Sequence, residues 1–215
     1  MIVNFREAVS GITHLLAALL ACAGLLWLMF LTRDDMLKML SMLLYGISTI
    51  SVFVASARLH LSHGSVEHMR KLRRQDHASI YFVMAGTYTP MTLLLLDGWW
   101  RIGMLICVWS FCLVGMYWKM KKLDGKSQTY ISTFMYLLIG WFAVIAAPQW
   151  VPRLPVETVA LIFFGGLVYS VGAIVFMLEK PNLGRHFGFH ELWHIFVIVG
   201  SALHFMAMVQ VALLV

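Results

Sequence analysis

The sequence predicts an all-α, polytopic membrane protein: one domain, residues 1–215, in which seven transmembrane helices form a bundle with a cytoplasmic N-terminus. The first observation behind this prediction is composition, because 61% of the residues are hydrophobic and only 12% are charged, against about 25% charged residues in soluble domains. The second is a series of long apolar runs. The third is the uneven distribution of lysine and arginine between those runs.

Each apolar run is close to the ~20 residues that an α-helix needs to cross the hydrocarbon core of a bilayer. In chain order, the predicted spans are residues 12–31, 36–60, 77–96, 99–118, 130–147, 156–177 and 191–215. Arg6 and the small residues Ala21-Cys22-Ala23 also suit a signal peptide, but the apolar run continues to Leu31, which favours a retained helix. Pro148, Pro152 and Pro155 predict a short loop between the fifth and sixth spans.

Basic residues set the expected orientation. Eleven lysines and arginines lie on the face shared by the N-terminus and the loops after spans two, four and six, and four lie on the other face. This asymmetry places the N-terminus in the cytoplasm. It also accounts for the net charge of +6, so no nucleic-acid partner is expected. The eleven are Arg6, Arg70, Lys71, Arg73, Arg74, Lys119, Lys121, Lys122, Lys126, Lys180 and Arg185, and the four are Arg33, Lys38, Arg101 and Arg153.

Ionisable side chains in a membrane bundle are costly, so each one raises a functional question. His190 and His194 stand four residues apart at the start of the last span, so both imidazoles lie on one helix face and can reach one metal ion. Ser56 and His60 form a second pair of this spacing at the end of span two, and Asp76 lies at the start of span three. All of these positions fall at cytoplasmic helix ends, so the topology predicts that they converge.

Together these side chains predict a zinc site. His60, His190 and His194 would form the three-histidine ligand set of a catalytic zinc ion with one position open to water. Asp76 would orient or deprotonate that water, and Ser56 would hydrogen-bond to water or substrate. Structural alternatives remain open: Asp76 as the cap of the third helix, Ser56 bonded to its own helix, and the histidines as interfacial anchors.

Other histidines are weaker ligand candidates. We expect His14 to bond to a neighbouring helix rather than to line the cavity, and His204 to make an interhelical hydrogen bond. His77 points about 100° around the helix from Asp76, away from the predicted site.

The run His190-Glu191-x-x-His194 also matches the zinc-protease pattern, with Glu191 as the general base. Leu96-Asp97-Gly98 and Leu123-Asp124-Gly125 are similar to the LDG element of intramembrane site-2 proteases. In that family, however, the His-Glu-x-x-His motif comes before the Leu-Asp-Gly element. In this chain both Leu-Asp-Gly segments come before the histidine motif. The order of motifs therefore argues against a protease.

Four motifs, taken in order, resemble the signatures of the hemolysin III family, the bacterial branch of the progestin and adipoQ receptors. The relationship extends to adiponectin receptors and alkaline ceramidases. Glu7 with Thr13-His14 is similar to the family's start. The four motifs are Ser56-x-x-x-His60, Arg74-Gln75-Asp76-His77-Ala78-Ser79-Ile80-Tyr81, Ala85-Gly86-Thr87-Tyr88-Thr89-Pro90 and Phe187-Gly188-Phe189-His190-Glu191-Leu192-Trp193-His194.

This resemblance implies seven helices with the N-terminus inside, in a bacterial cytoplasmic (inner) membrane. It implies zinc on His60, His190 and His194, with Asp76 and Ser56 beside the ion. The expected function is zinc-dependent hydrolysis of a lipid amide or ester, with a membrane lipid as substrate. The alternative is a non-catalytic membrane factor with structural zinc, either a pore-forming hemolysin or a regulator of membrane homeostasis, although the spans lack the polar stripe expected along a pore.

Overall fold

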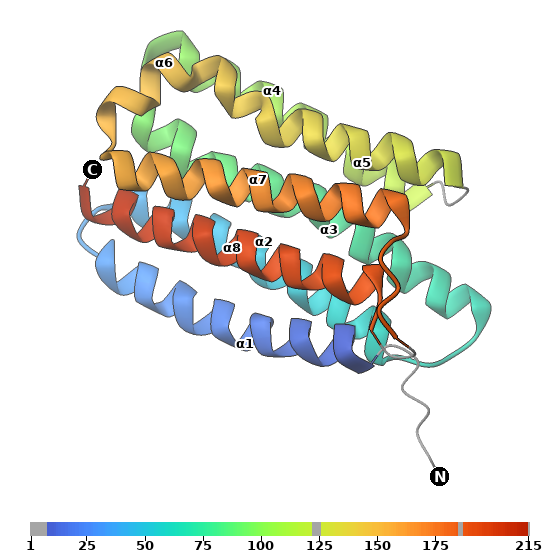
Figure 1. The fold of residues 1–215 in the computed structure, drawn as a ribbon. Coiled ribbons are helices and arrows are strands. Elements are labelled where there is room, and N and C mark those ends of the chain that lie inside the picture. The colour runs from blue at the N-terminus through green and yellow to red at the C-terminus, as the bar shows by residue number, and fades with distance from the viewer. Residues whose placement is uncertain (1–7, 122–125, 185–186, 215) are drawn as a thin grey trace.

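A computed structural model describes residues 8–121, 126–184 and 187–214 of the chain. Within these ranges the chain is helical, without strands, and seven helices are long and apolar enough to cross a membrane, which confirms the predicted fold class (Figure 1). Several predictions lie outside the described residues: those that involve Arg6, Glu7, Lys122, the second LDG copy at 123–125, Arg185 and Val215.

The helices follow one another with short connections. Their bounds are α1 Ala8–Leu31, α2 Met36–Leu61, α3 Val66–Leu95, α4 Gly98–Lys121, α5 Lys126–Trp141, the 3₁₀ turn η1 Phe142–Ala146, α6 Ala147–Trp150, the 3₁₀ turn η2 Val151–Arg153, α7 Val156–Leu178 and α8 Phe189–Leu214. Most bounds agree with the predicted spans to within a few residues. Two differ more.

The first difference is the start of α3, which begins at Val66 rather than at residue 77. Ser65 caps it, because its hydroxyl oxygen accepts the backbone N–H of His68 at 3.2 Å. The polar stretch after Ser65 is too hydrophilic to register as a span, yet it contains no glycine or proline to interrupt a helix. Asp76 therefore lies about three turns inside α3, which excludes the interpretation of Asp76 as a helix cap.

The second difference is the predicted proline loop, which is helical. The chain continues from α5 through η1, α6 and η2 to Arg153. Pro148 and Pro152 are the second residues of α6 and η2, within the first turn, where a helix needs no backbone N–H. The segment is further held by Trp150, whose indole N–H donates to the carbonyl of Ala143 at 3.1 Å.

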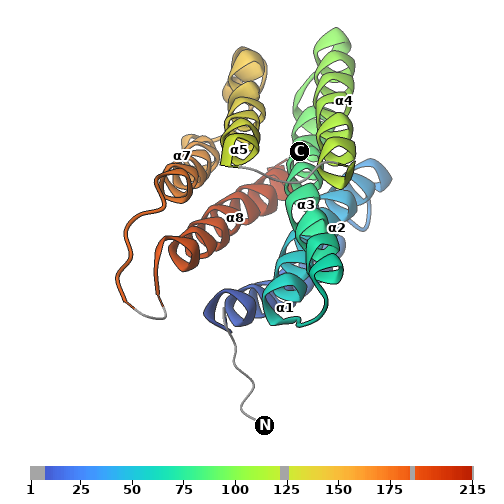
Figure 2. The same ribbon diagram turned by 90° about the vertical axis from the view of Figure 1, so that its right-hand side faces the viewer.

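Helices α1 to α4 pack in chain order, and α8 contacts α7, α1 and α2. Seen from one end of the bundle, α8 is central, with α5 and α7 to one side and α1 to α4 to the other (Figure 2). The contact of α2 with α3 is especially close. A Cβ atom at Gly86 would lie 2.0 Å from Ser48 Oγ and 3.2 Å from the Leu44 carbonyl oxygen, so only glycine fits there.

The outer faces of the helices carry large exposed apolar side chains, such as Leu20 and Leu26 on α1, each 72% exposed. Acyl chains cover such surfaces at no cost. Helix α2 ends where α1 and α8 begin (Figure 1). Because this end of the bundle carries the predicted cluster His60, His190 and His194, we call it the cluster end. The opposite end, where α1 and α8 finish, is the far end.

Candidate metal centre

Three histidines meet at the cluster end. His60 lies in the last turn of α2, and His190 and His194 lie in the first turns of α8. The Nε2 atom of His190 is 3.5 Å from that of His60 and 3.2 Å from that of His194. All three ligand nitrogens fall within 4.8 Å of one another, and His60 and His194 are buried. The three predicted ligands are therefore brought together.

The spacing of these nitrogens fits one metal ion. A tetrahedral zinc site with Zn–N distances of about 2.0–2.1 Å places neighbouring nitrogens about 3.3–3.4 Å apart. The two separations between Nε2 atoms, 3.2 and 3.5 Å, lie on either side of this value. Three imidazole nitrogens without a thiolate also suit a site that leaves a coordination position open. The histidines could thus bind one ion.

Close packing of α1 positions the His60 turn. A Cβ atom at Gly11 would lie 2.5 Å from Leu61 Cδ2 and 3.3 Å from His60 Cβ. Glycine at position 11 therefore lets the backbone of α1 approach the end of α2 directly. The same part of α1 reaches α8, since the hydroxyl of Ser10 donates to Glu191 Oε1 at 3.4 Å.

Glu191 forms the cap of α8. Its Oε2 atom accepts the backbone N–H of Gly188 at 2.9 Å, as the glutamate at the third helical position of a capping box does. With its other oxygen bonded to Ser10, the carboxylate is engaged in holding the helix start against α1. This arrangement disagrees with the protease interpretation, in which Glu191 would be the general base.

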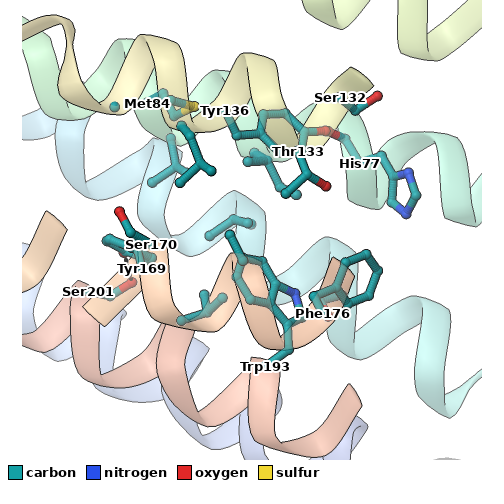
Figure 3. A pocket seen from close by; sticks show the side chains of 18 of the residues that line it. His77, Met84, Ser132, Thr133, Tyr136, Tyr169, Ser170, Phe176, Trp193 and Ser201 are labelled. Carbon is teal, nitrogen blue, oxygen red and sulfur yellow. Dashed lines mark hydrogen bonds between the residues drawn. The ribbon is translucent and has the colours of Figure 1, made fainter. Parts of the chain in front are cut away.

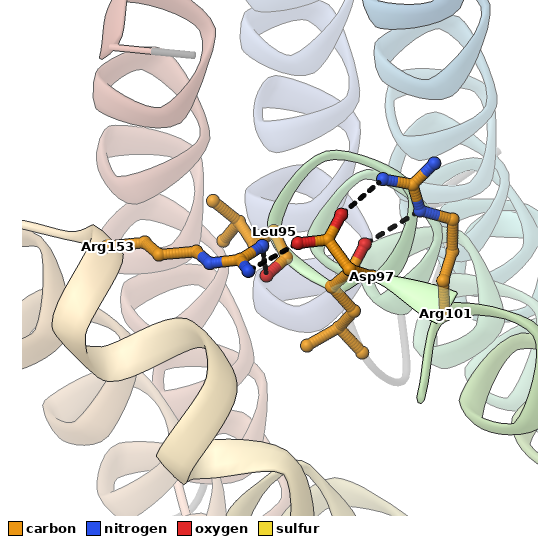
Figure 4. A network of polar contacts seen from close by, with 5 residues as sticks. Leu95, Asp97, Arg101 and Arg153 are labelled. Atoms are coloured by element: carbon orange, nitrogen blue, oxygen red, sulfur yellow. Dashed lines mark hydrogen bonds and ion pairs between the residues drawn. The ribbon is translucent and has the colours of Figure 1, made fainter. Parts of the chain in front are cut away.

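The first LDG copy lies at the far end of the bundle, beyond reach of the histidines. There Asp97 pairs with Arg101 and with Arg153, and Arg153 also donates to the carbonyl of Leu95 at 2.8 Å (Figure 4). These contacts tie η2 to the junction of α3 and α4. Asp97 is therefore part of a structural network.

Asp76 and Ser56 lie beside the cluster. The hydroxyl of Ser56 donates a hydrogen bond to the Asp76 carboxylate, which also interacts electrostatically with His60. Ser56 stands one turn before His60 in α2 and is 3% exposed. The predicted neighbours of the metal site are thus adjacent to it, joined across the contact between α2 and α3.

A cavity of about 210 Å³ extends from the cluster into the bundle. His190, His194, Asp76 and Ser56 line one part of it. The remainder is lined by apolar side chains together with polar ones such as Ser132, Thr133 and Ser201 (Figure 3). A second cavity of about 560 Å³ shares part of this lining toward the far end. The shared residues are Thr87, Tyr88, Gly140, Trp141, Gly166 and His204.

Several lining residues were missed by sequence reasoning. Tyr136 on α5 donates its hydroxyl to the His77 carbonyl at 3.1 Å, and Phe176 on α7 contacts Trp193 with ring centroids 5.6 Å apart (Figure 3). Lys119, at the end of α4, is buried in the same wall. These residues come from different helices, so no spacing in the sequence connects them. Of the missed residues, only Trp193 lies within a motif that the sequence had pointed out.

The remaining histidines partly follow expectation. His204 lies 3.3 Å from the carbonyl of Ile162 on α7, which confirms the interhelical bond. His14 bonds to α8, as predicted, but it also lines the cavity. His77 lines the cavity as well, because the cavity is wide enough to border two residues about 100° apart on α3.

Fold and site together define a seven-helix integral membrane protein with a three-histidine cluster at one end of its bundle. Residues 3–205 match the family model described as Haemolysin-III related, and the chain belongs to this family.

Named relatives support this assignment. The chain is 32% identical over 203 residues to the hemolysin-3 homolog of Bacillus subtilis (strain 168), covering 93% of this chain and 91% of the relative. It is 30% identical over 203 residues to hemolysin-3 of Bacillus cereus, covering 93% and 89%. A more distant similarity, 24% over 207 residues, links it to the human monocyte to macrophage differentiation factor and covers 94% of this chain and 83% of the relative.

Proposed function

We propose that this protein is a zinc-dependent hydrolase that cleaves an amide or ester bond of a membrane lipid. The observation that carries the proposal is the three-histidine cluster, which has a carboxylate beside it and opens into an apolar cavity. The bacterial relatives and the excess of basic residues predicted on one face support a location in the bacterial inner membrane, with the N-terminus in the cytoplasm.

His60, His190 and His194 would hold the zinc ion, which would polarise the substrate carbonyl and make a water molecule acidic near neutral pH. Asp76 accepts a proton from the attacking water as its oxygen bonds to the carbonyl carbon. As the C–N or C–O bond breaks, Asp76 returns that proton to the leaving nitrogen or oxygen. The hydroxyl of Ser56 holds the carboxylate in place for both transfers.

The cavity suits the acyl part of such a lipid. Beyond the polar groups at the cluster, its lining includes apolar side chains such as Val83, Met84 and Leu137. An acyl chain in this space would place its carbonyl at the histidines. Burial of the chain excludes bulk water from the reacting bond and strengthens the electrostatic contacts around it.

The names of the two Bacillus relatives suggest a second candidate function, that of a hemolysin. For this chain that would mean membrane lysis or pore formation, with zinc in a structural role. The mainly apolar lining of both cavities does not favour an aqueous pore. Dye leakage from liposomes containing the wild type or His190→Ala separates the two functions: leakage that the substitution leaves unchanged would favour a pore independent of the metal.

Hydrolysis is tested with zinc-loaded protein in lipid nanodiscs, supplied with ceramide or with an ester lipid. We expect fatty-acid release by the wild type and a loss of about 10²–10⁴-fold in Asp76→Asn at unchanged zinc content. Asp97→Asn is the matched control, because it removes a carboxylate from the far end of the bundle. Stoichiometric zinc without fatty-acid release from either class of lipid would contradict the proposal.

A further inference from the structure

His14 lies against the metal centre without belonging to the ligand set. It is 3% exposed on α1, and its ring centroid is 4.0 Å from that of His194 and 5.2 Å from that of Phe53. Its Nε2 atom lies 3.4 Å from the backbone oxygen of His194. Because a carbonyl oxygen only accepts, His14 carries its proton on Nε2. In the neutral ring, Nδ1 of His14 is then a hydrogen-bond acceptor.

His194 has the complementary requirement. Its Nε2 faces the Nε2 of His190 at 3.2 Å, so metal binding needs the Nε2 lone pair and leaves the proton on Nδ1. That Nδ1–H is a donor. Metal-binding histidines almost always give this second N–H to an acceptor, which fixes the tautomer and the orientation of the ring.

Both Nδ1 atoms are buried and lack a hydrogen-bond partner among the described residues. Within those residues, Arg74 Nε is the one other buried side-chain atom in this condition. Two adjacent rings, 4.0 Å apart, thus present an acceptor without a donor and a donor without an acceptor. Leaving a buried polar atom without a hydrogen bond is destabilising, and one water molecule between the two Nδ1 atoms would satisfy both.

We infer that His14 is a positioning residue of the metal centre: its Nδ1 accepts the Nδ1 proton of His194 through one bridging water molecule, and this holds His194 in the tautomer that presents Nε2 to the ion. The inference rests on the proposed metal centre and extends it to α1. Gly11 and the bond from Ser10 to Glu191 keep α1 close enough for this role.

The test is the zinc affinity of metal-free protein in detergent, measured by competition with a chelator. His14→Phe keeps an aromatic ring against Phe53 and His194 but has no acceptor, and His14→Leu is a second variant that lacks one. His14→Gln restores both a donor for the His194 carbonyl and an acceptor. His204→Phe is the matched control, because His204 is also a histidine bonded to the carbonyl of a neighbouring helix, but it is distant from the cluster.

We expect His14→Phe and His14→Leu to bind zinc about 10–100-fold more weakly than the wild type, which is the usual effect of losing such a partner. His14→Gln should recover most of this affinity, and His204→Phe should match the wild type. Wild-type affinity in His14→Phe or His14→Leu, or no recovery in His14→Gln, would overturn the inference. Zinc binding without lipid hydrolysis would instead count against the proposed function alone.

Discussion

The Nε2 atom of His60 lies 3.5 Å from the Nε2 atom of His190, although the two residues are 130 positions apart in the chain. They meet because α2 ends and α8 begins at the same end of the bundle. His190 and His194 alone would leave an ion only two protein ligands. His60 would supply the third, and it links the histidine cluster to the α2–α3 contact that holds Ser56 and Asp76.

Replacing Glu191 distinguishes a helix cap from a catalytic base. Glu191→Gln should hydrolyse lipid at close to the wild-type rate, because glutamine also serves in a capping box. Glu191→Ala should lower the free energy of unfolding by about 1 kcal/mol through loss of the cap. Fatty-acid release and unfolding are measured in parallel. A loss of about 10²-fold or more in Glu191→Gln would restore the protease-like assignment of Glu191 as a base.

Replacing Gly86 tests the close contact of α2 with α3. In Gly86→Ala the new Cβ meets Ser48 and the Leu44 carbonyl, so the helices must separate, and we expect a loss of about 1–3 kcal/mol in the free energy of unfolding.

Gly103→Ala is its control, because a Cβ there meets nothing within 4 Å. On an open helix surface, alanine should leave stability unchanged or raise it by up to about 1 kcal/mol. Unfolding by sodium dodecyl sulfate compares the two variants, and equal stabilities would argue against this packing.

The network at the far end predicts a pH effect. The hydrogen bond from Arg153, with the charges of Arg153 and Arg101, lowers the pKa of Asp97 below its ordinary value of 3.8. The folded state therefore binds this proton more weakly than the unfolded state, so the stabilisation is complete above about pH 4 and is lost as the pH falls through the folded pKa.

The thermal midpoint of the wild type should thus decline below about pH 4 more than that of Asp97→Asn. Because Asp97 is solvent-exposed, the difference should be small and should shrink further at high salt. The check is a series of thermal melts of both proteins at descending pH. Parallel declines would show that the pair contributes nothing measurable.

Much of the fold followed from the sequence because apolar length and basic loops are direct physical requirements of a bilayer. The convergence of His60 with His190 followed too, since the order of the spans fixes which helix ends share a depth. The start of α3 at Val66 did not, because a helix that continues into polar surroundings carries no hydropathy signal.

The contacts of individual side chains could not be predicted in the same way, because they depend on how each helix is rotated and packed against its neighbours. Nothing in the sequence brings Tyr136 or Phe176 to the cavity, since each lies on a helix without a charged or metal-binding motif. His14 was expected to bond to a neighbouring helix, but its partner is the backbone of a candidate ligand. The cap by Glu191 was foreseeable, because an acidic residue three positions after Gly188 matches the spacing of a capping box.

The most direct test of the metal centre is elemental analysis of purified protein, wild type beside His60→Ala and His77→Ala. His77 lies at the same end of the bundle but outside the cluster, so its variant controls for removal of an imidazole. The account predicts one zinc ion per chain in the wild type and in His77→Ala, and almost none in His60→Ala. Zinc retained at wild-type content in His60→Ala would contradict the three-histidine site.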